Sequence, residues 1–386
     1  MHYSDEQFPD DLIDIHVHVG IRGDGQYQGK GHFSYDFLED PIFDVFLQFA
    51  HVKREEANDD GLIDKLVQVL YDTKVPKIVC LALDHYFDPV TGIADPDRSK
   101  MWVANEFITD VLLRIDKIKE KILFGASVNP NDRENFERRT RECVEAGAVL
   151  MKWVPSSQGV NLADAHVRDS MVFLASAGKG GKPLPLLLHV GPEHSIPPPD
   201  EKMKSYDFLS WNTWDRVFNM FRRWHKPDVK TIRANIEAAL NAGATIIFAH
   251  CGTPYFKAPW YKGPSEHSDF DVVSDYLYRS ARNGFKGKCY ADVSAFVTPM
   301  RKPYFEKIKQ LPEDLLLFGS DYPNPVFELS AGPEEWWDDL THIILDGQVW
   351  RVVVPEDNLL DINYRELRHF FGEHPLFSNA HHLLME

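Results

Sequence analysis

A repeated pattern, a helical stretch followed by a short apolar strand, runs along the 386-residue chain and limits what it can fold into. The strands that we expect span residues 11–20, 77–83, 123–128, 148–154, 186–191, 245–252, 289–294 and 315–321. Strands separated by helices pair in parallel, and strands without clean alternation are buried on both faces. Eight such units therefore predict an α/β fold: a single (β/α)8 TIM barrel, with residues 1–386 as one domain.

The helices between these strands are expected at residues 60–74, 102–119, 132–146, 164–176, 232–242, 272–283 and 304–310. The chain is longer than a bare barrel of roughly 250 residues. The surplus falls in three long loops, 20–59, 191–230 and 253–269, each after the carboxyl end of a strand, on the face where such barrels carry their active sites. The glycine-rich start of the first loop lacks the spacing of a phosphate-binding loop.

Aromatic side chains are frequent in the second and third loops. They form either a local core or a contact surface for substrate, and the sequence leaves both readings open. The residues are Tyr206, Phe208, Trp211, Trp214, Tyr255, Phe256, Trp260 and Tyr261.

Composition excludes several classes of protein. No apolar run approaches the roughly 20 residues of a membrane span, and the acidic start does not resemble a signal peptide. The net charge of -17 argues against nonspecific nucleic-acid binding, which needs a basic surface. Four cysteines far apart in the sequence favour reduced thiols in a cytoplasmic protein. We therefore expect a cytoplasmic protein that acts on a small molecule, with no nucleic-acid or membrane partner.

Polar residues stand near the ends of five of the expected strands, and a barrel brings such ends together at one rim. His16 and His18 alternate on the first strand, so both imidazoles point to the same face. Ile13, Ile15, Val17 and Val19 are expected on the opposite face, buried against a packed layer. Later strands contribute one residue each: Lys152, His189, His250 and Asp321. One buried histidine is usually a hydrogen-bonded core residue, but four at equivalent positions are hard to explain without a purpose. This nitrogen and oxygen set suits zinc, or else manganese, iron or cobalt.

Three segments give these residues a family resemblance. Ile13-Asp14-Ile15-His16-Val17-His18, Phe248-Ala249-His250-Cys251-Gly252 and Phe318-Gly319-Ser320-Asp321-Tyr322-Pro323 are similar to motifs of the amidohydrolase superfamily. Their wording is similar to that of the amidohydrolase-related branch, which contains hydrolases, lactonases and decarboxylases such as the aminocarboxymuconate semialdehyde decarboxylase type.

The resemblance implies a role for each residue. His16, His18, His189 and Asp321 would hold the metal, and Asp321 would also accept a proton from metal-bound water. His250 would bind a second metal or polarise the substrate. Lys152 matches the position where members with two metals carry a carbamylated lysine. We expect one ion rather than two, with Lys152 then contacting substrate or a carboxylate.

Three functions stay open on the sequence. The first is hydrolysis of an ester, lactone or amide of a small organic acid by metal-activated water. The second is nonoxidative decarboxylation of an aromatic or unsaturated acid, for which Arg22 or Arg301 could bind the carboxylate. The third is a barrel that holds a metal and only binds a ligand. His194 could compete for a metal or substrate role, and a homo-oligomer stays open.

Overall fold

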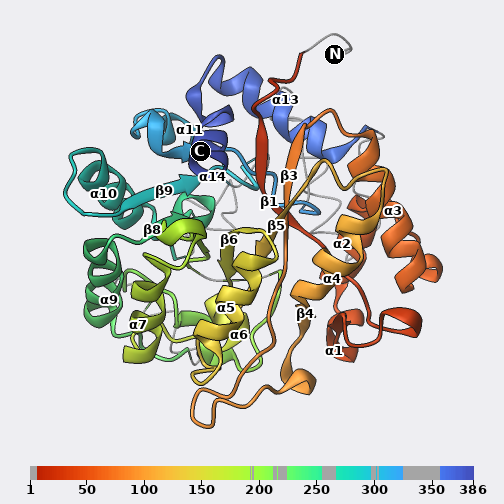
Figure 1. The fold of residues 1–386 in the computed structure, drawn as a ribbon, viewed down its shortest axis with the longest axis horizontal. Helices are drawn as coiled ribbons and strands as arrows, with labels where there is room; N and C mark the ends of the chain where they lie inside the picture. The colour runs from red at the N-terminus through yellow and green to blue at the C-terminus, as the bar shows by residue number, and fades with distance from the viewer. Residues whose placement is uncertain are drawn as a thin grey trace.

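The structure is a computed structural model, which describes residues 7–386 except 192, 194, 212–214, 216–223, 254–266, 297–300, 302–303 and 325–356. Its centre is an eight-stranded parallel sheet curled into a barrel (Figure 1). The strands, in their order around the sheet, are β1 (Ile13–His18), β3 (Lys77–Leu81), β5 (Ile122–Ala126), β6 (Ala148–Trp153), β7 (Leu186–Leu188), β8 (Thr245–Phe248), β9 (Lys288–Asp292) and β10 (Leu316–Leu317). The predicted (β/α)8 barrel is confirmed.

Backbone hydrogen bonds close the barrel between its first strand and its last. Ile15 N–H donates to the carbonyl oxygen of Phe318 at 3.2 Å, and Asp321 N–H donates to that of His16 at 2.8 Å. One step further, His18 N–H donates to the carbonyl oxygen of Tyr322 at 2.9 Å. The closure therefore places Asp321, 305 positions later in the chain, directly beside the two histidines of β1.

Helices cover the outside of the barrel (Figure 1). They are α1 (Tyr35–Leu38), α2 (Pro41–Phe49), α3 (Asp59–Asp72), α4 (Asn105–Asp110), α5 (Phe136–Glu145), α6 (Pro155–Gln158), α7 (Ala165–Leu174), α9 (Val229–Ala242), α10 (Phe270–Ala281), α11 (Phe305–Ile308), α13 (Leu359–Phe371) and α14 (Asn379–Met385).

Local sequence signals set the ends of these helices. The side chain of Asp228 accepts from Thr231 N–H at the start of α9, and Gly243 ends that helix at a φ of 112°. A side-chain oxygen at the first position satisfies a free N–H group, and glycine adopts positive φ without a steric penalty. These two residues explain why α9 begins three residues before the predicted start at 232 and ends where predicted.

The barrel interior is a separate apolar cluster from the layer between strands and helices. Ile13 and Ile15 belong to the interior cluster, whereas Val17 and Val19 pack in the outer layer. We expected all four on one face, opposite the histidines, and this expectation is wrong. The pairing of β1 with β3 is irregular between Asp14 and Val17, and a shift of one residue exchanges the two faces of a strand.

Two other expectations about the elements need correction. The stretch 101–103, whose last two residues we expected to begin a helix, is strand β4 (Met101–Val103), and the helix proper begins at Asn105. β4 pairs antiparallel with β2 (Gly31–Phe33), so the first long loop contains ordered structure: β2, α1 and α2. Periodicity could not find β2 and β4, because they are three residues long and pair across 70 residues.

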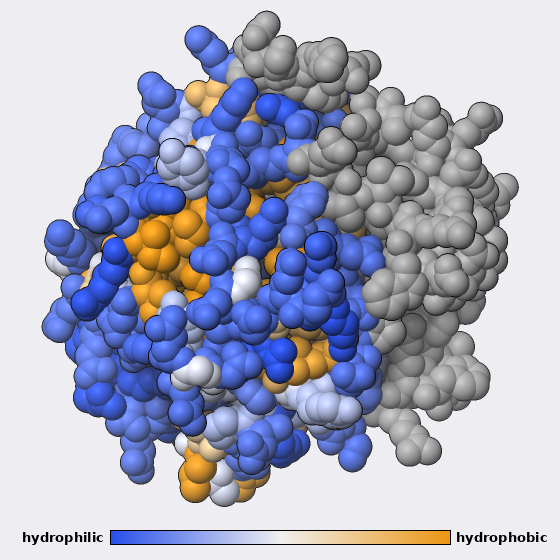
Figure 2. Space-filling view, turned by 90° about the vertical axis from the view of Figure 1, so that its right-hand side faces the viewer, coloured by the Kyte–Doolittle hydropathy of each residue, from blue (hydrophilic) through white to orange (hydrophobic). Residues whose placement is uncertain are grey.

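The surface beside α2 and α3 is mostly hydrophilic, with hydrophobic side chains in separate small patches (Figure 2). Across the described ranges, no helix is both long enough and apolar enough to cross a bilayer. All four cysteines are buried, and none of them forms a disulfide.

Candidate metal centre

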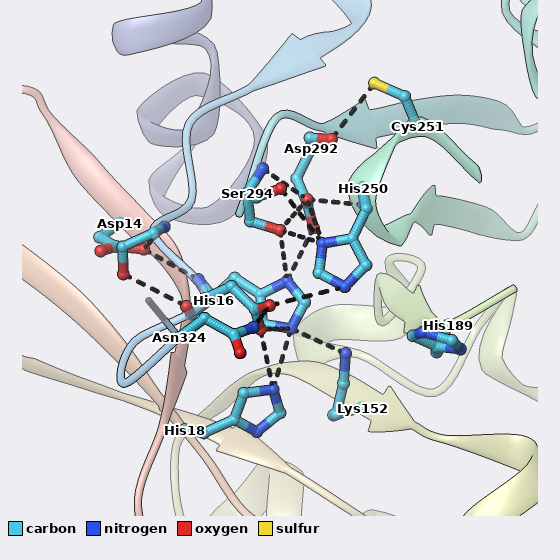
Figure 3. A network of polar contacts seen from close by, with 12 residues as sticks. Asp14, His16, His18, Lys152, His189, His250, Cys251, Asp292, Ser294 and Asn324 are labelled. Carbon is cyan, nitrogen blue, oxygen red and sulfur yellow. Dashed lines mark hydrogen bonds and ion pairs between the residues drawn. The ribbon is translucent and has the colours of Figure 1, made fainter. Parts of the chain in front are cut away.

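Three donor atoms from the two ends of the sheet meet at the rim of the barrel. His16 Nε2 lies 3.2 Å from His18 Nε2, and each of these nitrogens lies 3.3 Å from Asp321 Oδ1. His16 and Asp321 are buried, and His18 is partly exposed. The three distances make a nearly equilateral triangle, and Figure 3 shows the His16 and His18 rings that supply two of its corners.

A second layer of polar groups fixes the orientation of His16. Its Nδ1 lies 3.0 Å from Asp292 Oδ2 and 3.0 Å from Ser294 Oγ. A contact from Nδ1 to a carboxylate favours the tautomer whose Nε2 carries a free lone pair. His16 is therefore held with its Nε2 directed to the other donors.

Asp292 also organises the strand end that carries His250. Its Oδ1 accepts from His250 N–H at 2.9 Å and from Ser294 N–H at 3.0 Å. The rings of His16 and His250 are stacked, with centroids 5.0 Å apart, and His250 Nε2 lies 3.8 Å from Asp321 Oδ2. His250 thus stands beside the triangle and faces the second oxygen of Asp321.

Backbone strain is concentrated at the same strand ends. His250, Cys251, Ala295 and Asp321 have φ values of 54°, 53°, 53° and 63°, in the left-handed region that side chains other than glycine rarely adopt. Such residues cluster at functional sites, where surrounding contacts hold them. The contacts of Asp292 provide this restraint for His250.

His189 stands apart from the triangle, as Figure 3 shows. Its Nδ1 lies 3.3 Å from Asp207 Oδ2, and its Nε2 lies 3.3 Å from Glu193 Oε2. All three side chains are buried, and His189 and Glu193 line the same cavity as the triangle. The structure therefore brings His189 to the site but pairs its Nε2 with a carboxylate.

Lys152 is also at the rim, with its side chain buried and Nζ 3.0 Å from His16 Nε2. Leu150, two residues earlier on β6, lies in the barrel interior, so Lys152 stands above it as expected. No carboxylate in the described part of the chain forms a salt bridge with Lys152. Burial lowers the pKa of Lys152 to about 8, because a charged ammonium group is less stable away from water.

The protonation of the donors suits a cation. Burial lowers the pKa of His16 to about 4, so its imidazole is neutral at pH 7. Burial opposes ionisation of Asp321, but His250, His16 and His18 outweigh it and hold the pKa of that carboxyl well below its usual value. Metal ions bind neutral imidazole and ionised carboxylate.

The triangle also fits a metal ion in size. Zinc binds nitrogen and oxygen at about 2.0–2.2 Å in tetrahedral sites, which separates the ligand atoms by about 3.3 Å. The observed separations of 3.2 and 3.3 Å match this value. His16, His18 and Asp321 can therefore hold a divalent ion, and His189 lines the same cavity with its Nε2 paired to Glu193.

Other candidates from the sequence fall into three groups. Arg301 is buried and lines the cavity. Arg22 is partly exposed and does not line the cavity; its side chain donates a hydrogen bond to the carbonyl oxygen of Ala57 and forms a salt bridge with Asp24. Tyr206, Phe208 and Trp211 do not line the cavity, and Phe208 is fully buried, which favours the local-core reading for them. His194, Trp214, Tyr255, Phe256, Trp260 and Tyr261 lie outside the described residues.

Sequence reasoning missed the carboxylates that orient the histidines. Asp292 lies near the end of the predicted strand 289–294 and is the last residue of β9, so it was a recognisable candidate beside the other residues near strand ends. Glu193 and Asp207 lie in a long loop, where no periodicity marks a position. Asn324, which donates through Nδ2 to Asp321 Oδ2, follows the last strand in the same way.

Fold and site together define a (β/α)8-barrel protein with a histidine and aspartate metal-binding geometry at the carboxyl ends of its strands. The family model described as amidohydrolase matches residues 13–351. The chain therefore belongs to the amidohydrolase family, as the motifs predicted. Membership makes it an enzyme of hydrolase or lyase type; such enzymes act on small molecules and usually use divalent metals.

Similar solved structures span nearly the whole chain at low identity. A protein from Agrobacterium tumefaciens, solved in its apo form, has 10% identity, a TM-score of 0.44 and coverage of 98% of this chain and 97% of its own. A probable 2-pyrone-4,6-dicarboxylic acid hydrolase from Acinetobacter baumannii, with citric acid bound, has 13% identity, a TM-score of 0.36 and coverage of 94% and 99%. An amidohydrolase from Bifidobacterium longum subsp. infantis has 12% identity, a TM-score of 0.39 and coverage of 93% and 98%. No curated protein matches.

Proposed function

We propose that this enzyme is a metal-dependent hydrolase that acts on an ester, lactone or amide of a small organic acid. The observation that carries the proposal is the triangle of His16, His18 and Asp321, with a carboxylate oxygen left over at Asp321 Oδ2. We expect His16, His18, His189 and Asp321 to hold one divalent ion, most simply zinc. A divalent ion lowers the pKa of a water molecule to about 7 and polarises a carbonyl oxygen.

The side chains around the triangle supply the proton transfers. Asp321 Oδ2 accepts the proton of the attacking water, within reach of His250 Nε2 at 3.8 Å. His250 receives this proton from Asp321 and passes it to the leaving group, or else it polarises the substrate carbonyl. Lys152, with its ammonium at the rim, stabilises negative charge that develops on the substrate oxygen.

Nonoxidative decarboxylation of an aromatic or unsaturated acid is the second candidate. Arg301 favours it, because this buried guanidinium lines the cavity and could bind the carboxylate of such a substrate. The two reactions differ in their products. Release of carbon dioxide means a lyase, whereas an acid group newly formed by addition of water means a hydrolase.

The test has two steps. Metal analysis of the purified protein is expected to give one zinc, manganese, iron or cobalt ion per chain. A panel of lactones, esters, amides and aromatic acids is then assayed with the loaded enzyme. Turnover of an acyl compound with incorporation of solvent oxygen supports the proposal, and turnover restricted to carboxylic acids with release of carbon dioxide contradicts it.

We further propose that residues 1–386 work as one catalytic domain in the cytoplasm. The supporting observations are that the site draws on strands from β1 to β10, that α14 packs against both, and that all four cysteines are free.

A further inference from the structure

The cavity that contains the metal centre continues away from it into an apolar chamber. The whole cavity, metal centre included, has a volume of about 120 Å³. One side carries the polar residues of the rim, and the other is built by the segment between β1 and α3 and by α3 itself. That second wall consists of Phe33, Phe37, Phe43, Phe46, Leu47, Ala50, Val52, Leu62, Leu66 and Met101, with Lys65. We call this wall the phenylalanine pocket.

Three rings give the phenylalanine pocket a fixed shape. Phe33, Phe37 and Phe43 are buried, and their ring centroids are separated by 5.4 to 5.6 Å. These distances are typical of packed aromatic pairs. The same rings form a small core of the segment 33–57, but that core is hollow on the side facing the metal centre.

The phenylalanine pocket directly adjoins the ligand-bearing strand. A Cβ atom added at Gly20, two residues after His18, would lie 2.6 Å from the ring of Phe33 and 3.6 Å from Met101. The glycine therefore allows the Phe33 ring to pack against the backbone that leaves β1. His16, His18 and the phenylalanine pocket line one cavity, so a molecule whose reacting group sits at the two histidines can extend into the pocket.

The chemistry of this wall selects an apolar occupant. Among its described residues, Lys65 on α3 is the single charged side chain, so water in the chamber finds few hydrogen-bond partners. Apolar cavities of about 150 Å³ in proteins stay dry and bind benzene. The whole cavity has a volume of about 120 Å³, so its apolar part, which is open at one end to the catalytic centre, accepts at most one ring or a short branched chain.

We propose that the substrate carries, next to its reacting group, an apolar group about the size of a benzene ring, and that the phenylalanine pocket binds this group. This inference rests on the proposed function for the position of the reacting group. Binding of the apolar group itself requires neither metal nor turnover, which allows the two proposals to fail separately.

The first experiment uses the metal-free protein and fluorobenzene as the probe, followed by ¹⁹F NMR. Saturable broadening or a shift of the fluorine signal is expected for the native protein. The variant Ala50→Phe places a ring in the pocket and is expected to abolish this binding. Gln48→Phe adds the same ring to α2 at a position that does not line the cavity, and it should bind fluorobenzene normally.

A further variant keeps the proposal testable if Ala50→Phe does not fold. Phe46→Ala enlarges the pocket, and it is expected to bind 1-fluoronaphthalene at least about 10-fold more tightly than the native protein does. Absence of fluorobenzene binding to the native protein, or equal binding by Ala50→Phe when circular dichroism shows it folded, overturns the proposal.

The second experiment uses the zinc-loaded protein and two hydroxamates, acetohydroxamate and phenylacetohydroxamate, which share a metal-chelating group and differ by a phenyl ring. The phenyl compound is expected to bind roughly 30-fold more tightly or better, the scale of burying one ring. Ala50→Phe should reduce this ratio to near one and leave acetohydroxamate binding unchanged. If the native protein binds the two hydroxamates with equal affinity, the pocket proposal is overturned and the proposed metal function still holds. If the protein binds fluorobenzene but neither hydroxamate in a zinc-dependent way, the proposed metal function is overturned and the pocket proposal still holds.

Discussion

Asp321 meets two different demands with its two carboxylate oxygens. Oδ1 completes the triangle with His16 Nε2 and His18 Nε2, and Oδ2 accepts from Asn324 and faces His250. A carboxylate whose pKa is held well below its usual value is ionised at neutral pH, as a metal ligand must be, although the same shift makes it a weaker base.

Asp321→Asn tests this residue as the proton acceptor. The amide keeps an oxygen for the metal but cannot accept a proton, so turnover is expected to fall by at least about 100-fold, the usual scale of general-base loss. Metal content is expected to persist and is measured alongside the rate. Asp36→Asn, which removes an exposed carboxylate on α1, is the control. Rates near normal in the Asp321 variant would assign the base elsewhere, first to His250.

The histidines of β1 test the metal centre itself. Replacing both His16 and His18 by alanine is expected to remove bound metal completely, because two of the three triangle donors are lost. The far-UV circular dichroism should stay that of the native barrel. A matched control replaces His381 and His382, two neighbouring histidines on α14 near the carboxyl terminus. Metal retained at one equivalent by the β1 variant would contradict the assignment.

Lys152 decides between one metal and two. Lys152 Nζ lies 3.0 Å from His16 Nε2, where a bound cation would repel its positive charge. Because the pKa of Lys152 is about 8, its ammonium group loses a proton more easily than that of an exposed lysine. We expect full activity at one equivalent of zinc added to metal-free protein, with Lys152 unmodified. A requirement for two equivalents, together with the mass of a carbamate on this lysine, would show the binuclear alternative.

At the scale of elements, one carboxylate connects three strand ends. Asp292, the last residue of β9, contacts His16 on β1, the backbone of His250 after β8 and the backbone of Ser294 in its own turn. Residues that orient a metal ligand in this way contribute about 10- to 100-fold to metal affinity.

Asp292→Asn is therefore expected to weaken zinc binding by about 10- to 100-fold, although this side chain belongs to the layer behind the triangle. The amide keeps the shape of the carboxylate but no longer favours the required tautomer of His16. Competition with a chromophoric chelator measures the dissociation constant. An unchanged constant would mean that His16 is oriented by Ser294 alone.

Elements whose pattern is local could be predicted from the sequence. Eight apolar strands, the intervening helices and the histidines near strand ends were visible because each depends on residues within a few positions of one another. The reversal of faces within β1 was not visible, because it arises from an irregular pairing with β3. The pairs His16–Asp292 and His189–Asp207 were likewise hidden, since nothing in a single sequence tells which of many acidic residues lies behind a given histidine.

At the scale of the whole molecule, the residues beyond a minimal barrel serve two purposes. The segment 31–52 builds an apolar wall beside the metal centre, whereas the segment 201–211 packs on the start of α10. The second contact is centred on His267, whose side chain is fully buried and stacked on Phe208 with 3.8 Å between ring centroids.

His267 is clamped between two buried carboxylates. Its Nδ1 lies 3.1 Å from Asp215 Oδ2, and its Nε2 lies 3.1 Å from Asp269 Oδ2. Burial lowers the pKa of this imidazole, but the two carboxylates outweigh burial and raise it to about 10. Asp269 in turn accepts from Leu209 N–H at 2.9 Å, so the protonated ring links the long segment to α10.

The link makes the stability of the fold dependent on pH. The unfolded chain releases the proton of this histidine near pH 6.5, whereas the folded chain keeps it up to about pH 10. The stabilisation by protonated His267 is therefore fully present below pH 6.5 and is lost as the pH rises towards 10. Over this range the free energy of unfolding changes by about −1.4 kcal/mol per pH unit. Urea unfolding at pH 7, 8 and 9 measures this slope in the native protein and in His267→Gln. The variant is expected to be less stable at pH 7 and to lose less stability than the native protein between pH 7 and 9; parallel losses in the two proteins would show that His267 is not charged in the fold.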